Sequence, residues 1–139
     1  MEKKPIKTGL LRGDGPPPGY IWNVLIFDLA FREAMSFLTE DQYQHLKMQF
    51  KELASENDPS HSQTCDVENI EDFHELRDKG GVLGKINVRV YFGLEHNKNN
   101  LIVLGCIKKE SEGKTPTGDR IRMQRRWRKY KSGEFTLNS

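Results

Sequence analysis

Hydrophobic and polar residues in the first half of the chain follow a pattern that predicts a strand and then two helices. Residues 20–28 are rich in β-branched and aromatic residues, as is typical of a strand. Asp28 can cap a helix over residues 29–38, and Thr39 with Gln42 has the capping-box spacing that starts a second helix. Apolar residues share one face of each helix, namely Ala30, Ala34, Phe37 and Leu38, then Tyr43, Leu46, Phe50, Leu53 and Ala54. We therefore expect a helical hairpin that covers a sheet.

The second half of the chain has the pattern of three strands and a last helix. After a loop over residues 56–69, apolar segments at 72–77, 85–94 and 101–107 are separated by short polar turns, which indicates an antiparallel meander. A helix is expected to begin near Pro116, because proline is favoured in a first helical turn. The predicted fold is α+β in the order β-α-α-β-β-β-α, with an antiparallel sheet, the helical hairpin on one face and a basic C-terminal helix.

The middle strand has two different faces. Its apolar face, suited to the helical hairpin, consists of Ile86, Val88, Val90 and Phe92. Asn87, Arg89 and Tyr91 share the other face, which would then be polar. A central strand has little structural reason to place an arginine between Asn and Tyr, so we interpret Arg89 as functional. The alternative is that Arg89 is a solvated sheet residue.

Length and composition favour a single domain. The chain has 139 residues, and we expect a domain at 20–131 between a flexible arm at 1–19 and a tail at 132–139. Its two cysteines form no metal-site pattern, and no cofactor motif is found. No segment has the roughly 20 apolar residues of a membrane span, and the first residues have no apolar signal core. These features predict a cytoplasmic protein without metal, cofactor or membrane contact.

Positive charge is concentrated near the end of the chain. Residues 108–131 contain ten Lys or Arg against three acidic residues, a balance of +7, whereas the whole chain has +2, so the rest has −5. Such a segment favours a polyanionic partner, nucleic acid first. The alternatives are a solvated helix face, or a patch that an acidic partner neutralises.

On the last helix this charge is organised into one arc. Helical spacing of 100° per residue places Met123, Trp127 and Tyr130 on one packing stripe. A neighbouring arc presents four cations, which are Arg122, Arg125, Arg126 and Lys129. We expect these cations to bind an RNA backbone.

Four stretches, taken in order, resemble the RelE/ParE toxin superfamily, most closely its HigB-like, phage-associated branch. They are FDLAFREAMSFL, ELRDKGGVLGKINVRVYF, LIVLGCIKKESEGKTP and RIRMQRRWRKY, within residues 20–131. The resemblance implies a RelE-like fold. It also implies the toxin of a type II toxin–antitoxin system, a metal-independent endoribonuclease that cuts mRNA on the ribosome. A cognate antitoxin would be its protein partner.

The resemblance also implies roles for individual residues. Arg89 matches the strand arginine that contacts the scissile phosphate, and Arg77 matches the arginine of the family's Leu-Arg pair. Lys108 and Lys109 match the paired lysines at the end of a strand, and Tyr130 is a loose counterpart of the tyrosine near the C-terminus. Planar guanidinium groups suit the charge that develops on a phosphorane, because each can hold two phosphate oxygens.

The general acid and base are left open by the sequence. Where RelE-like toxins have a lysine before the Leu-Arg pair, this chain has Glu75, with His74 beside it. Strand residues alternate between faces, so at most one of the two can lie on the Arg89 face. His74 suits a base because histidine titrates near neutral pH, while Glu75 alternatively pairs with an arginine. Tyr91 and Tyr130 are candidates either for stacking on an RNA base or for the core.

Two other functions remain open. A ParE-like member would inhibit DNA gyrase and needs no catalytic group. A further alternative is a non-catalytic member of the superfamily that binds nucleic acid or protein. An acid or base group beside the Arg89 face would distinguish the endoribonuclease from both.

Overall fold

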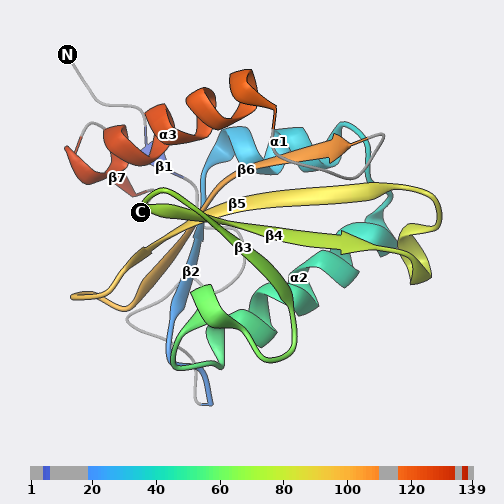
Figure 1. The fold of residues 1–139 in the computed structure, drawn as a ribbon, viewed down its shortest axis with the longest axis horizontal. Coiled ribbons are helices and arrows are strands. Elements are labelled where there is room, and N and C mark those ends of the chain that lie inside the picture. Colours follow the sequence, from blue (N-terminus) through green and yellow to red (C-terminus); the bar gives the residue numbers. More distant parts are fainter. Residues whose placement is uncertain (1–4, 7–18, 110–115, 134–135, 138–139) are drawn as a thin grey trace.

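The computed structural model describes residues 5–6, 19–109, 116–133 and 136–137, which form an α+β fold (Figure 1). Its five-stranded sheet has the order β2-β6-β5-β4-β3. The strands are β2 (Asn23–Ile26), β3 (Asp66–Ile70), β4 (Phe73–Lys79), β5 (Asn87–Glu95) and β6 (Asn100–Lys109). The helices are α1 (Asp28–Met35), α2 (Glu40–Ala54) and α3 (Thr117–Lys131), with short 3-10 turns at Pro59–His61 and Gly81–Leu83. Separately, β1 (Pro5–Ile6) pairs in parallel with β7 (Thr136–Leu137).

The sheet is mixed, and this corrects the expectation of a purely antiparallel one. β3, β4, β5 and β6 form an antiparallel meander, but β2 runs parallel to β6. The connection from β2 to β6 contains α1, α2, β3, β4 and β5, so it is long enough for the crossover that a parallel pair requires. β3 lies within the segment predicted to be a loop. It is an edge strand with mostly exposed or half-exposed residues, so it lacks the apolar pattern that marks a buried strand.

Helix starts agree with the sequence in two cases and differ in one. Thr39 and Gln42 form the expected capping box, with Gln42 N donating to Thr39 Oγ1 at 3.2 Å and Thr39 N donating to Gln42 Oε1 at 2.9 Å. Pro116 is the N-cap of α3, as expected. Asp28, predicted to cap α1, is instead the first residue of that helix, and its carboxylate pairs with Arg32 at 2.9 Å.

Helices lie on both sides of the sheet, with α3 above it and α2 below it in Figure 1. On the α3 side, a Cβ atom at Gly93 or Gly105 would collide with Trp127 or Met123, so these two glycines let α3 approach the strands closely. Met123 and Trp127 are both buried, which confirms the packing stripe predicted for this helix. On the opposite side, Val88, Val90 and Phe92 belong to the core, as the alternation predicted.

The outer edge of β6 is completed by side chains rather than by a full strand. β2 pairs only with Asn100–Val103 of β6. Beyond that point Arg126 Nη1 donates to the carbonyl oxygen of Leu104 at 2.8 Å, and Cys106 N donates to Glu33 Oε1 at 3.1 Å. Glu33 and Arg126 also join each other through two hydrogen bonds of 2.9 Å. An ion pair between α1 and α3 therefore takes the place of the missing strand.

Candidate phosphate-binding pocket

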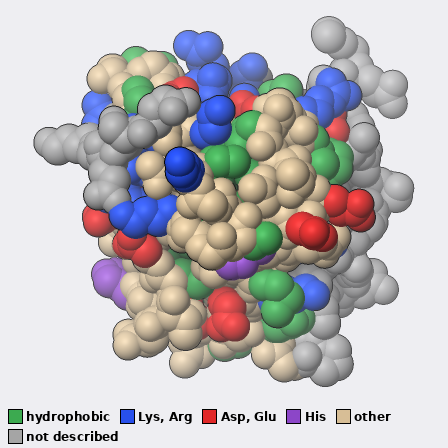
Figure 2. Space-filling model, turned by 90° about the vertical axis from the view of Figure 1, so that its right-hand side faces the viewer, with side chains coloured by type: hydrophobic (Ala, Val, Ile, Leu, Met, Phe, Trp, Pro, Cys, Tyr) green, Lys and Arg blue, Asp and Glu red, His purple; other side chains and the backbone are tan. Residues whose placement is uncertain are grey.

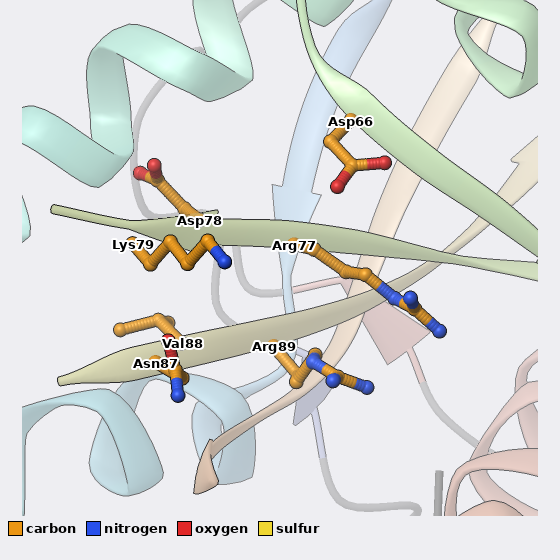
Figure 3. Close-up of a pocket in the computed structure, with 7 residues that line it drawn as sticks. All are labelled: Asp66, Arg77, Asp78, Lys79, Asn87, Val88 and Arg89. Carbon is orange, nitrogen blue, oxygen red and sulfur yellow. The ribbon is translucent and has the colours of Figure 1, made fainter. Parts of the chain in front are cut away.

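The α3 side of the sheet carries a group of cations beyond the part that Met123 and Trp127 cover. Cross-strand pairing places Arg77 opposite Arg89, and Lys79 opposite Asn87. Asp66 on the edge strand pairs with Arg77 and so shares its face. These residues line a pocket of about 240 Å³ together with Asp78 and Val88. We call it the arginine pocket; Figure 3 shows Arg77 and Arg89 extending in the same direction, with Asp66 beside them.

A buried carboxylate joins the two arginines. Glu75 is 0% exposed. Its Oε1 accepts from Arg77 Nε at 2.7 Å, and its Oε2 accepts from Arg89 Nη1 at 3.1 Å. The side chain of Arg89 is only 4% exposed, whereas that of Arg77 is 30% exposed. We call these three residues the Glu75 cluster; within it, Arg77 offers the accessible guanidinium.

The environment of Arg77 keeps this residue charged. Burial by itself lowers the pKa of the Arg77 guanidinium, but the hydrogen bond and charge of Glu75, with smaller contributions from Glu68 and Asp66, raise it overall. Glu68 Oε1 lies 3.9 Å from Arg77 Nη1, at the exposed edge strand. Arg77 is thus a permanent cation, and carboxylates border it.

Arg89 differs from its expected environment. The sequence predicts an open polar face with a functional Arg89 at its centre, or alternatively a solvated sheet residue, but Arg89 is buried and paired with Glu75. The physical reason is the strand register. Glu75 pairs with Tyr91, which is two residues from Arg89 on the same face of the sheet, so the carboxylate of Glu75 reaches the Arg89 guanidinium. Because Arg89 also lines the arginine pocket, the structure leaves it at the site but not free in solvent.

The two candidate bases lie on opposite faces, as alternation requires, and neither is exposed to the pocket. His74 pairs with Phe92 across the strands, packs its ring against that residue at 5.3 Å between centroids, and shares a 2.7 Å hydrogen bond with Asn69. Desolvation lowers the pKa of His74 to about 4, so it is neutral at pH 7. Glu75 is on the Arg89 face, but it is enclosed in its two ion pairs.

Both tyrosines that are candidates for stacking on an RNA base make contacts inside the protein instead. Tyr91 is fully buried, with its ring edge-on to Phe73, so it is not accessible to an RNA base. Tyr130 donates from its hydroxyl to Glu95 Oε1 at 2.8 Å and lies parallel to Trp127. Burial, and then Glu95, raise the pKa of Tyr130, which keeps its hydroxyl protonated.

The two lysines of the predicted pair lie on opposite faces of the sheet, and the cations of the predicted arc on α3 have different environments. Lys109 pairs with Asn87 and shares the Arg89 face, whereas Lys108 pairs with Val88 on the other face. Arg126 is mostly buried against Glu33, and Arg122 pairs with both Asp119, at 3.1 Å, and Glu33, at 3.7 Å.

Exposed cations on α3 include residues that the sequence did not single out. Arg125 is exposed as expected, and Lys129 is half-buried. Arg120 and Arg128 are also exposed, and Arg120 lines a second pocket that includes Arg77. Figure 2 views the end of the molecule where β4 and β5 meet, and Lys and Arg side chains gather over its upper part, with Asp and Glu side chains on both sides and below. Helical periodicity could have identified Arg128, but not the pairing of Arg126.

Two further pocket residues, Asp66 and Lys79, are not predicted by the sequence, whereas Asn87 lies on the Arg89 face as alternation predicts. Asp66 was assigned to a loop, and Lys79 to a turn, so nothing in the sequence placed them beside Arg77. Among the described residues, no group of three or more His, Cys, Asp or Glu could hold a metal ion. Within the same part of the chain, no helix has the length and apolar character needed to cross a membrane.

No family model matches the chain, and no curated protein matches it.

Proposed function

We propose that this chain is the toxin of a type II toxin–antitoxin system, a RelE-like, metal-independent endoribonuclease that cuts mRNA on ribosomes in the cytoplasm. The observation that supports this most is the pair Arg77 and Arg89 lining one pocket with Lys79 and Asn87. A guanidinium that is fixed at one side still has N–H groups for two phosphate oxygens. Arg77, as the more exposed of the two, contacts the scissile phosphate, and a cognate antitoxin covers the pocket when the toxin is silent.

The pocket also contains groups for proton transfer that differ from those expected. Asp66 is an exposed carboxylate at the pocket, whereas Asp78 bonds to His45 on the other side of the sheet at 2.8 Å. In the proposed reaction Asp66 takes the proton of the 2′-OH, and the 2′-oxygen attacks phosphorus. The bond from phosphorus to the 5′-oxygen breaks, and Lys79 gives that oxygen a proton. The products are a 2′,3′-cyclic phosphate and a 5′-hydroxyl, with Arg77 stabilising the phosphorane.

A second function is favoured by a specific observation. His74, Glu75, Tyr91 and Tyr130, the acid, base and stacking candidates of the sequence, are all occupied elsewhere in the fold. A ParE-like gyrase inhibitor, or a non-catalytic nucleic-acid or protein-binding member of the superfamily, needs none of them. Asp66 decides between these functions and the endoribonuclease, because only cleavage requires its carboxylate.

The test is induced expression with mapping of mRNA ends, with and without a block of translation. The parent should arrest growth and produce cuts that disappear when translation is blocked. Arg77→Ala should lower the cleavage rate by roughly a hundredfold, and Arg77→Lys should recover part of it because lysine lacks the two-oxygen fork.

Asp66→Asn should remove cleavage and retain binding to single-stranded RNA. Growth arrest without mRNA cuts, together with inhibited DNA supercoiling, would overturn the proposal in favour of the gyrase inhibitor. RNA binding without either activity would favour the non-catalytic member.

A further inference from the structure

Glu75 is buried and bonded to two arginines. A catalytic base could not reach a substrate from this position, but a residue that orients the arginines requires it. Glu75 contacts no solvent, and each of its two oxygens accepts a hydrogen bond from a different arginine of the pocket. Arg77 donates to the carboxylate through Nε, and its Nη1 lies 3.9 Å from Glu68 Oε1. Arg89 is bound through one terminal nitrogen, Nη1.

We propose that Glu75 is a positioning residue that holds Arg77 and Arg89 in the orientation in which they receive a phosphate. This inference depends on the proposed phosphate-binding function of the arginine pocket. An arginine side chain has several rotatable bonds, and its freedom is lost either on folding or on binding. Since Glu75 fixes both side chains in the folded protein, a phosphate finds their remaining donors already aligned, and binding does not have to order them.

The molecule itself contains a matched control for the test. Glu33 also lies between two arginines, Arg122 and Arg126, but at the junction of α1, α3 and the edge of β6. Glu33→Gln and Glu75→Gln remove the same charge from the same kind of cluster. If Glu75 acted only through stability, the two variants should slow the reaction in proportion to their losses of melting temperature.

The experiment measures three quantities for the parent, Glu75→Gln and Glu33→Gln at a temperature at which circular dichroism shows each protein folded. They are the affinity for a short single-stranded RNA, the single-turnover rate of mRNA cleavage on ribosomes, and the melting temperature. We expect Glu75→Gln to lower the cleavage rate by roughly a hundredfold, as misplacement of a catalytic group does. Glu33→Gln should leave the rate within about twofold of the parent, because the Glu33 cluster has no part in the pocket.

A second variant and a second measurement keep the inference testable if Glu75→Gln does not fold. Glu75→Asp keeps the anion but shortens its reach, so it should hold one arginine and show an intermediate rate. In the parent, the Arg77 Nε proton should exchange slowly with solvent by NMR before RNA is added, since it is bonded in the free protein.

Equal slowing by Glu75→Gln and Glu33→Gln, a parental rate in folded Glu75→Gln, or a rapidly exchanging Arg77 Nε proton would each overturn the positioning role. A parent that neither binds nor cleaves RNA would instead overturn the proposed function.

Discussion

Two glutamates in this molecule each lie between two arginines, and the two clusters serve different ends. In the Glu75 cluster the carboxylate is fully buried, and Arg77 projects into a pocket. In the Glu33 cluster, formed by Glu33, Arg122 and Arg126, the carboxylate side chain is 23% exposed, and Arg126 gives one of its N–H groups to the carbonyl of Leu104. In the Glu75 cluster, Arg77 faces the open pocket. In the Glu33 cluster, Arg126 instead hydrogen-bonds the edge of β6.

The difference shows that an arginine's ion pair does not by itself reveal its role. Glu33 and Arg126 are 93 residues apart in the sequence, and their hydrogen bonds join α1 to α3. Glu33 thus neutralises part of the charge of the basic segment although it lies outside that segment. What distinguishes the two clusters is the space next to the guanidinium. Positive charge on α3 is therefore partly structural. Its exposed share lies at Arg120, Arg125 and Arg128, and at Arg122 and Lys131, which are also in ion pairs.

The largest expected contrast is in stability. Glu75→Ala leaves two arginines without their anion inside the protein, and breaking a buried pair in this way costs about 3–5 kcal/mol. Glu33→Ala should cost about 1–2 kcal/mol, because water reaches its arginines and replaces part of the lost contact. Urea denaturation followed by circular dichroism measures both losses, with exposed Glu52→Ala as the control. An equal loss at Glu33 and Glu75 would show that burial does not separate the clusters.

A second contrast lies within α3. Arg126→Ala should lower the free energy of unfolding by about 1–3 kcal/mol, because Glu33 and the carbonyl of Leu104 lose a charged donor. Arg125→Ala, at an exposed position of the same helix, should change it by less than about 0.5 kcal/mol. For RNA binding the order reverses: Arg125→Ala should lower the slope of log affinity against log salt by roughly one unit, and Arg126→Ala should leave it unchanged. If Arg126→Ala alone reduces the slope, the mostly buried arginine is the one that contacts RNA.

Much of the fold could be predicted from local patterns. The capping box at Thr39, the start of α3 at Pro116 and the apolar stripe of Met123 and Trp127 each depend on residues within one or two turns of each other. β3 and the parallel pairing of β2 could not be predicted in this way. An exposed edge strand carries little hydrophobic alternation, and the partner of a strand is decided by the packing of distant segments.

Less of the site could be predicted, because a site depends on register. Alternation correctly placed Arg89 and Tyr91 on one face of β5, but it could not show that α3 covers Tyr91 or that Glu75 reaches Arg89. If Arg89 lay on an open polar face, Arg89→Ala would leave the fold intact. With Arg89 buried, the same substitution leaves Glu75 short of a partner, so a stability measurement has to accompany any loss of activity.

A half-buried histidine, His74, gives a further contrast, because desolvation has the largest influence on its pKa. Burial lowers its pKa to about 4, below its usual value of 6.5, so the unfolded chain binds the proton more readily. His74 therefore costs no stability near pH 7, and stability should fall as the pH decreases from about 6.5 toward 4. His74→Gln should flatten this part of the curve of unfolding free energy against pH. An unchanged curve for His74→Gln would assign the acid sensitivity to other groups.

The smallest expected effect concerns the cross-strand partner of Glu75. Glu68 pairs with Glu75 in the sheet, yet its side chain is 54% exposed and lies 3.9 Å from Arg77 Nη1. A phosphate that binds Arg77 must compete with this carboxylate, whose attraction across water is about 1 kcal/mol or less. Glu68→Gln should therefore bind single-stranded RNA about twofold to fivefold more tightly. Glu52→Gln carries the same change of net charge at a distant exposed position, so it separates a local effect from a general one. Equal tightening in Glu68→Gln and Glu52→Gln would mean that Glu68 does not compete for Arg77, and weaker binding in Glu68→Gln alone would mean that it supports the site.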